Sequence, residues 1–151
     1  MRFLPALVTL AVLTGCATPY QQKGFRGGFS ETRLESNVFR VTFRGNGYTS
    51  EERAADYALL RSAELALENG FGYFVITDKS MGSSTSSAAA PTWSEYLSYS
   101  GDRDGYASSS YTDTIVCFQS RPEMATVYDA ASLRDSLAQK YGLTLKQASG
   151  S

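Results

Sequence analysis

Apolar and polar residues alternate strictly over residues 37–45, whereas other segments of the chain follow different periods. A period of two is that of a strand with one buried face, so we predict a strand here. Two further runs, over residues 71–77 and 111–119, are rich in aromatic and β-branched residues and predict two more strands. The side chains expected to face the core from the first strand are Phe39, Val41 and Phe43.

Apolar positions recur with a helical period over residues 50–68, which predicts one long helix. Thr49 and Glu52 fit a capping box at its start, and Asn69-Gly70 fits a left-handed cap at its end. Asp56 falls inside the apolar arc and therefore needs a partner or water. The polar stripe of this helix consists of Tyr57, Arg61, Glu64 and Glu68.

The order of these elements predicts the fold class. A second helix is expected over residues 127–141, where Leu133, Leu137 and Tyr141 recur at spacings of four. The chain should therefore form an α+β fold: a small three-stranded, mainly antiparallel sheet with one long helix packed on a face and a C-terminal helix. We expect a single domain over residues 31–145, with a long mobile insert at 79–110 and a disordered tail at 146–151.

The first sixteen residues resemble the leader of a bacterial lipoprotein precursor. A basic start is followed by an apolar stretch at residues 3–13, which is shorter than the roughly 20 residues needed to span a membrane. Leu13-Thr14-Gly15-Cys16 resembles a lipobox. In such precursors residues 1–15 are removed by cleavage after Gly15, and Cys16 receives a diacylglyceryl group and an acyl chain such as palmitate. The alternatives are an ordinary secretory signal with a chance cysteine at its end and a buried apolar helix.

The residues after the cysteine predict where the chain is held. Proteobacterial lipoproteins with aspartate in the next position are retained in the inner membrane, and this chain has Ala17 there. That resemblance implies the outer membrane, with the domain facing the periplasm. Residues 16–30 contain glycine, proline and polar residues without periodicity, so we expect a lipidated tether.

The amino-acid composition limits the functions that the chain could have. The 151 residues include no histidine, which removes the commonest general base and metal ligand, and the formal net charge of −1 gives no case for nucleic acid. We therefore expect no enzyme, no metal and no cofactor besides the covalent lipid on Cys16. Cys117 would have no disulfide partner once Cys16 is lipidated. Its apolar surroundings predict a buried inert thiol rather than a reactive one.

Four segments, taken as a set, resemble a family of small uncharacterised proteobacterial lipoproteins known only by locus names. They are Gly28-Phe29-Ser30-Glu31-Thr32, Phe43-Arg44-Gly45-Asn46-Gly47-Tyr48, Asp56-Tyr57 to Leu60-Arg61-Ser62-Ala63-Glu64, and Gly70 to Phe74-Val75-Ile76. The resemblance covers residues 13–78 and the third strand. It implies the fold and the lipid anchor, and it brings no known activity.

We expect the domain to bind another envelope protein or a cell-wall component such as peptidoglycan. The insert places aromatic residues among small polar ones, which is typical of adaptable protein-binding loops. A hairpin extension that buries these rings against its own sheet would have the same composition. The candidate binding residues are Arg61, Glu64, Trp93, Tyr96, Tyr99 and Tyr106.

Two other function classes stay open. A peptidoglycan-active hydrolase would use carboxylates such as Asp56, Glu64 or Asp78, although capping, ion pairing and strand termination also explain these residues. A small-ligand sensor would need a pocket, which sequence periodicity cannot reveal.

Overall fold

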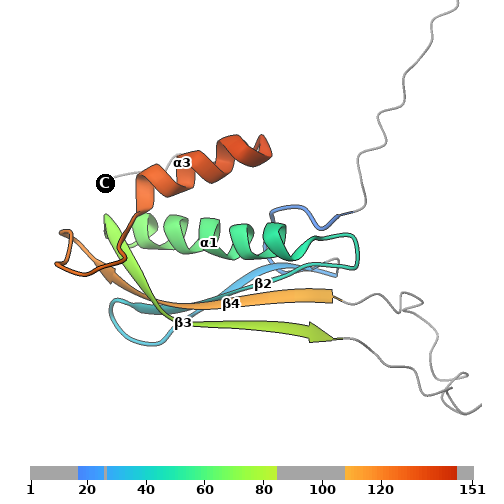
Figure 1. Ribbon diagram of the computed structural model, residues 1–151, viewed down its shortest axis with the longest axis horizontal. Coiled ribbons are helices and arrows are strands. Elements are labelled where there is room, and N and C mark those ends of the chain that lie inside the picture. Colours follow the sequence, from blue (N-terminus) through green and yellow to red (C-terminus); the bar gives the residue numbers. More distant parts are fainter. Residues whose placement is uncertain (1–16, 26, 85–107, 146–151) are drawn as a thin grey trace, which may run out of the picture.

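The computed structural model describes residues 17–25, 27–84 and 108–145. These residues form an antiparallel five-stranded sheet with two helices packed on it, which confirms the predicted α+β class (Figure 1). The strand order across the sheet is β1-β2-β4-β3-β5. The strands are β1 (Gly28–Arg33), β2 (Val38–Arg44), β3 (Tyr73–Ser84), β4 (Ser108–Phe118) and β5 (Tyr128–Asp129).

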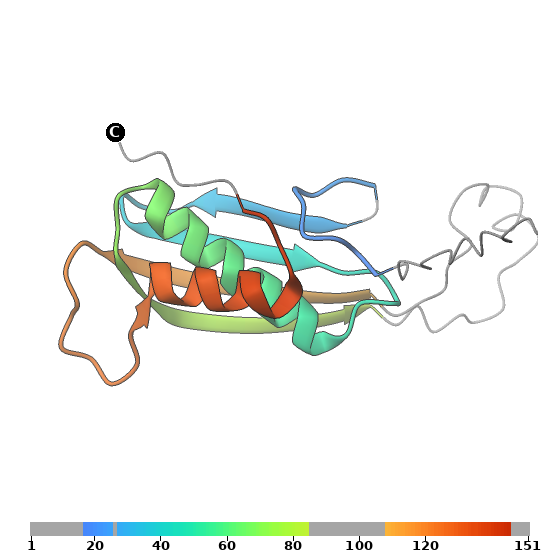
Figure 2. The ribbon, with the colours of Figure 1, turned by 90° about the horizontal axis from the view of Figure 1, so that it is seen from above.

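Both helices lie on the same side of the sheet. Helix α1 (Glu51–Glu68) rests on the strands, and helix α3 (Ala130–Tyr141) packs against α1 farther from the sheet (Figures 1 and 2). Small side chains let α1 approach the strands closely. The alanines of α1 that are 0% exposed are Ala54, Ala58, Ala63 and Ala66.

The alternation in β2 places its side chains as predicted. Phe39, Val41 and Phe43 are at most 2% exposed and face α1, while Arg40 and Arg44 between and beyond them are exposed. The register continues this pattern into the neighbouring strand, because Phe39 pairs with Ile115 of β4. β2 and β4 therefore each contribute one row of side chains to a core between the sheet and α1.

Helix α1 ends as predicted, but its start differs by one residue. Ser50 is the N-cap, and its side chain accepts a hydrogen bond from the Arg53 backbone N–H. Asn69 is the C-cap, and Gly70 follows with a φ of +79°, the left-handed conformation that glycine adopts without strain. The predicted capping box of Thr49 and Glu52 is therefore wrong, since the Thr49 hydroxyl is used elsewhere.

The prediction of three strands is wrong, because two edge strands escaped it. β1 carries one buried aromatic residue, Phe29, among small and polar residues, so it lacks a clear alternation. β5 has only two residues and lies inside the segment predicted as helix 127–141, which starts at Ala130 with Asp129 as its N-cap. Short edge strands need little sequence signal, because only one side of each is paired with the sheet.

The central hairpin is longer than the sequence predicted. β3 continues to Ser84 and β4 begins at Ser108, so both flanks of the predicted insert 79–110 are paired strand. The register shifts between Ile76 and Asp78, where β3 contains a bulge. Beyond Thr77 the strand continues in mostly small and polar residues, which lack the aromatic and β-branched signal on which the prediction rested.

The predicted tether over residues 16–30 is also corrected where the structure describes it. Thr18 is 1% exposed, the aromatic ring of Tyr20 packs among core residues, and β1 begins at Gly28. The partners of this segment lie 28 to 44 residues farther along the chain. Contacts between residues so far apart in sequence leave no periodic pattern. The prediction of a tether therefore rested on composition alone.

Candidate functional site

The N-terminal segment, residues 17–25 and 27, is docked on the loop that precedes α1. The backbone N–H of Thr18 donates to the Thr49 hydroxyl at 3.1 Å, and the backbone N–H of Asn46 donates to the Thr18 hydroxyl at 2.8 Å. Thr49 is only 5% exposed, so both hydroxyls satisfy buried backbone groups. The Gly45-Asn46-Gly47 turn thus holds the start of the domain.

Two glycines make room for this contact. A Cβ on Gly45 would lie 2.5 Å from the Thr49 Cβ, and a Cβ on Gly27 would lie 2.3 Å from the Arg44 carbonyl oxygen. Real side chains do not tolerate such distances. Gly27 also has a φ of +94°, which disfavours any L side chain. Glycine at these positions therefore allows the segment to lie directly on the end of β2.

Tyr20 fixes the same segment to α1. Its hydroxyl donates to the Glu64 carboxylate, and its ring centroid lies 4.9 Å from that of Phe29 and 5.3 Å from that of Tyr57. Burial, and then the hydrogen bond to Glu64, raise the pKa of Tyr20 above its ordinary value. The phenol therefore stays protonated at neutral pH and can donate to Glu64.

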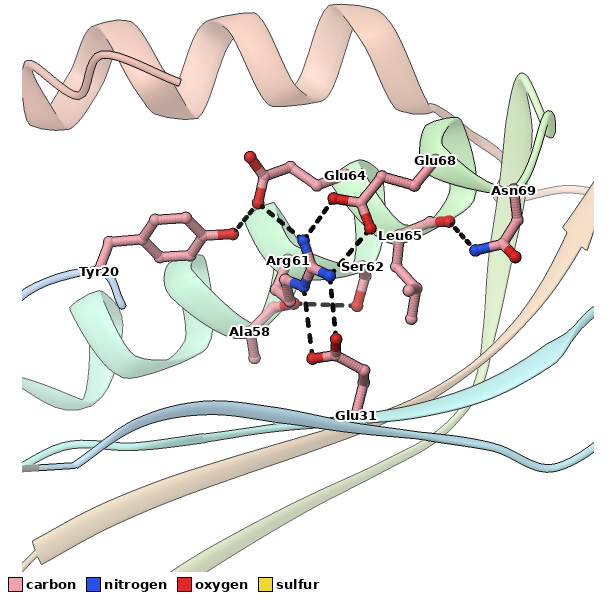
Figure 3. Close-up of polar contacts among 9 residues, drawn as sticks. All are labelled: Tyr20, Glu31, Ala58, Arg61, Ser62, Glu64, Leu65, Glu68 and Asn69. Atoms are coloured by element: carbon pink, nitrogen blue, oxygen red, sulfur yellow. Dashed lines mark hydrogen bonds and ion pairs between the residues drawn. The ribbon is translucent and has the colours of Figure 1, made fainter. Parts of the chain in front are cut away.

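Arg61 lies at the centre of this contact, and Figure 3 shows its guanidinium surrounded by three carboxylates. Five hydrogen bonds reach Glu31, Glu64 and Glu68, at distances between 2.8 and 3.4 Å, so each of the five N–H groups has an acceptor. Although burial alone lowers the pKa of Arg61, its hydrogen bonds to Glu68 and Glu31 raise it above the ordinary value. The Phe29 ring covers one face, with its centroid 4.8 Å from the Arg61 Cζ.

Arg61 and Glu64, which were predicted to bind a partner, are both occupied by contacts within the domain. Arg61 is 8% exposed, and its N–H groups point to Glu31 of β1 and to neighbours on its own helix. Glu64 is engaged by Arg61 and by Tyr20. Both predicted binding residues therefore hold the N-terminal segment, β1 and α1 together.

Asp56 joins the two helices. Lys140 Nζ and the Tyr141 hydroxyl of α3 donate to the same Asp56 carboxylate oxygen at 2.6 and 2.7 Å. Asp56 thus has the partner that its place in the apolar arc required. The hydrogen bonds to Asp56 and Glu52 raise the pKa of Lys140 above its ordinary value. Asp56, which the hydrolase alternative would use, has a structural contact that accounts for it.

Asp113 is a buried acidic residue that was not among the predicted site residues. This residue is 2% exposed, lies in β4 on the face that carries Ile115 and Cys117, and leaves its Oδ1 without a hydrogen-bond partner. Burial raises the pKa of Asp113, while Lys79, its register partner in β3, opposes the shift. The period of two along β4 would have placed Asp113 on the buried face.

The remaining candidates divide between the core and the undescribed residues. Cys117 is 1% exposed, and burial raises its pKa to about 12, in agreement with the predicted buried thiol. The predicted lipidation and cleavage positions and the aromatic candidates of the insert lie outside the described residues. They are Gly15, Cys16, Trp93, Tyr96, Tyr99 and Tyr106.

Within residues 17–25, 27–84 and 108–145, no helix is both long and apolar enough to cross a membrane. No group of three His, Cys, Asp or Glu side chains in these ranges could hold a metal ion. Comparison of the chain with protein-family models, with curated proteins and with solved structures found no match.

Proposed function

We propose that the chain is a membrane-anchored envelope lipoprotein whose domain binds another envelope protein or the cell wall without catalysis. In this proposal the leader is removed after Gly15 and the acylated Cys16 holds the domain at a membrane. Ala17 favours the outer membrane, with the domain in the periplasm. The domain then acts next to the membrane surface.

The position of Thr18 carries the proposal. This residue is the second after the lipobox cysteine, and it is already buried and hydrogen-bonded to the loop before α1. The start of the folded domain therefore coincides with the start of the chain that lipoprotein processing would leave. Two or three acyl chains on Cys16 would be a sufficient anchor for such a domain.

Labelling with radioactive palmitate in a proteobacterial host tests the anchor. The wild-type chain should incorporate label and fractionate with the outer membrane, whereas Cys16→Ser should incorporate none. Cys117→Ser is the matched control, because it removes the other cysteine, which is buried far from the lipobox in sequence. Incorporation by Cys16→Ser, or an intact leader in the mass of the wild-type product, would contradict the anchor.

Crosslinking in intact cells tests the binding role. The expected result is one specific envelope protein, or peptidoglycan fragments, captured by the wild-type chain. The structure sets the limits of the informative deletion: Ser84 and Ser108 are register partners, so residues 85–107 can be replaced by Asn-Gly without cutting a paired strand. Loss of capture assigns binding to the insert. Retained capture assigns it to the described domain and contradicts the role of Trp93, Tyr96, Tyr99 and Tyr106.

The hydrolase alternative has its own test on the same chain. Asp56 and Glu64 each have ion-pair and tyrosine partners, so these contacts give both carboxylates structural roles. Purified protein should therefore release no fragments from peptidoglycan. Release that is lost in Asp56→Asn or Glu64→Gln, while folding is retained, would replace the binding proposal by catalysis.

A further inference from the structure

The link between Cys16 and the folded domain is a single residue, Ala17. Consecutive Cα atoms lie about 3.8 Å apart, so the Cα of Cys16 lies within about 7.6 Å of the Cα of Thr18. The headgroup layer of one leaflet is roughly 5 to 8 Å thick, from the difference between the hydrocarbon core and the whole bilayer. A lipid on Cys16 therefore brings the docking site of Thr18 to the level of the headgroups.

The docking site defines one end of the molecule. Thr18 is held by Asn46 and Thr49, in the loop between β2 and α1. The adjacent Gly45 N–H donates to the Ser109 carbonyl at the start of β4. Figures 1 and 2 show the N-terminal segment and the start of α1 at this end, and the loop between β4 and β5 at the opposite end.

Two aromatic side chains are exposed close to the docking site. Phe25 is 95% exposed, and it lies two residues before Gly27, which sits against Arg44 and Thr18. Tyr48 is 58% exposed and directly precedes Thr49 in sequence. Aromatic rings favour the boundary between headgroups and acyl chains, where an apolar ring and a polar group can both be accommodated.

The charged side chains at this end do not favour its contact with a membrane. Lys23 and Arg44 are exposed there, but so are Glu51 and Glu52 in the first turn of α1. Electrostatic attraction to anionic lipid is therefore small, and the short covalent link and the two rings decide the orientation.

We propose that the end of the domain that carries Thr18, Phe25 and Tyr48 is a membrane-facing surface, held against lipid headgroups by the one-residue link to Cys16. This inference rests on the proposed acylation of Cys16. A fourteen-residue extended spacer, by contrast, would allow the domain to stand roughly 46 Å away. The docked segment fixes both the distance of the domain from the bilayer and the face that it turns outward.

Tryptophan fluorescence tests the orientation. Trp93 is the single tryptophan of the chain, so Trp93→Phe gives a background into which Phe25→Trp, Tyr48→Trp or Met124→Trp is introduced. Met124 is 55% exposed and lies in the loop at the opposite end, which makes it the matched control. The native lipoproteins are reconstituted into phosphatidylethanolamine and phosphatidylglycerol vesicles with brominated acyl chains as quencher.

Phe25→Trp and Tyr48→Trp should lose roughly half of their emission relative to vesicles without bromine, because rings at headgroup level lie near the upper acyl carbons. Met124→Trp should keep its emission. No quenching at positions 25 and 48, or equal quenching at 124, would overturn the proposed surface. Circular dichroism confirms that each variant is folded.

A variant with a longer spacer distinguishes the effect of the short link from the membrane affinity of the two aromatic rings. Insertion of twelve glycine and serine residues between Ala17 and Thr18 should reduce quenching at position 25 toward the level of the Met124→Trp control. Unchanged quenching would overturn the role given to the short link. The mass of each purified protein reports the lipid: absence of lipid contradicts the proposed acylation, whereas lipid without quenching contradicts only the orientation.

Discussion

Thr18 and Thr49 are joined by a hydrogen bond across thirty-one positions of sequence, from the backbone N–H of Thr18 to the Thr49 hydroxyl at 3.1 Å. Both residues are at most 5% exposed. The bond attaches the N-terminal segment to the loop before α1. The Thr49 hydroxyl is therefore not used to cap the helix, a role that Ser50 takes. The Thr49 side chain is therefore one of the contacts that stabilise this end.

Thr49→Val should destabilise the domain by about 1 to 3 kcal/mol, because the buried N–H of Thr18 loses its acceptor without gaining water. Urea unfolding measures the change. Thr49→Ser keeps the hydroxyl and serves as the control, with a smaller loss from the missing methyl group. Equal midpoints for wild type and Thr49→Val would show that the Thr18 contact contributes nothing to stability.

Arg61→Met should reduce the free energy of unfolding by about 2 to 3 kcal/mol, since it leaves three carboxylates close together without their cation. The loss is smaller than for a fully buried pair because the Glu68 side chain is 46% exposed. Arg40→Met, at an exposed position of β2, is the control and should change little. A loss no larger than that of the control would remove Arg61 from the contacts that hold the segment.

Asp113→Asn should stabilise the domain near pH 7 by about 1 kcal/mol, because a buried carboxylate with an unpaired oxygen is replaced by a neutral amide. Burial raises the pKa of Asp113 above 3.8, so the native state holds the proton more tightly than the unfolded chain. Stability is therefore lost as pH rises through the raised pKa. The gain from the amide should vanish near pH 3, where Asp113 is protonated in both states.

Urea titrations at the two pH values check this prediction. Asp78→Asn is the matched control, since Asp78 is an exposed aspartate on the neighbouring strand. A stability loss in Asp113→Asn at pH 7 would mean that the charge is required, and it would make Asp113 a candidate for a functional group.

Cys117 should react with iodoacetamide at pH 8 roughly a hundredfold more slowly in the folded protein than in urea, because the thiolate is the reactive form. The thiol is 1% exposed, and burial raises its pKa to about 12. Mass spectrometry at increasing urea concentrations should show labelling that follows global unfolding. Rapid labelling of the native protein would contradict a buried inert cysteine.

The sequence predicted those elements whose signal is local. The alternation around Val41 and the helical period up to Glu68 each arise within one segment, and both elements form as expected. β1 could not be predicted in this way, because its stability comes from pairing with β2 and from the contact of Glu31 with Arg61. The second half of β3 was missed because its small and polar residues lack the aromatic and β-branched signal of the first half.

The candidate site follows the same division. The ion pairs of Arg61 with Glu64 and Glu68 were predictable from helical spacing, since three and seven residues return to one face. The pairing with Glu31 and the hydrogen bond of Tyr20 to Glu64 join residues 30 and 44 positions apart, and no periodicity reports them. Asp113 was predictable from the alternation of β4, but an acidic residue within an apolar strand did not fit the expected pattern.

The docking of Tyr20 onto Glu64 also sets an order of events during synthesis. Its partner is 44 residues downstream, so the contact cannot form until α1 has emerged and folded. Before that moment Tyr20 has none of its contacts with the helix. Afterwards the hydroxyl and the ring of Tyr20 are both engaged, so the N-terminal segment becomes part of the folded domain only once the helix is in place.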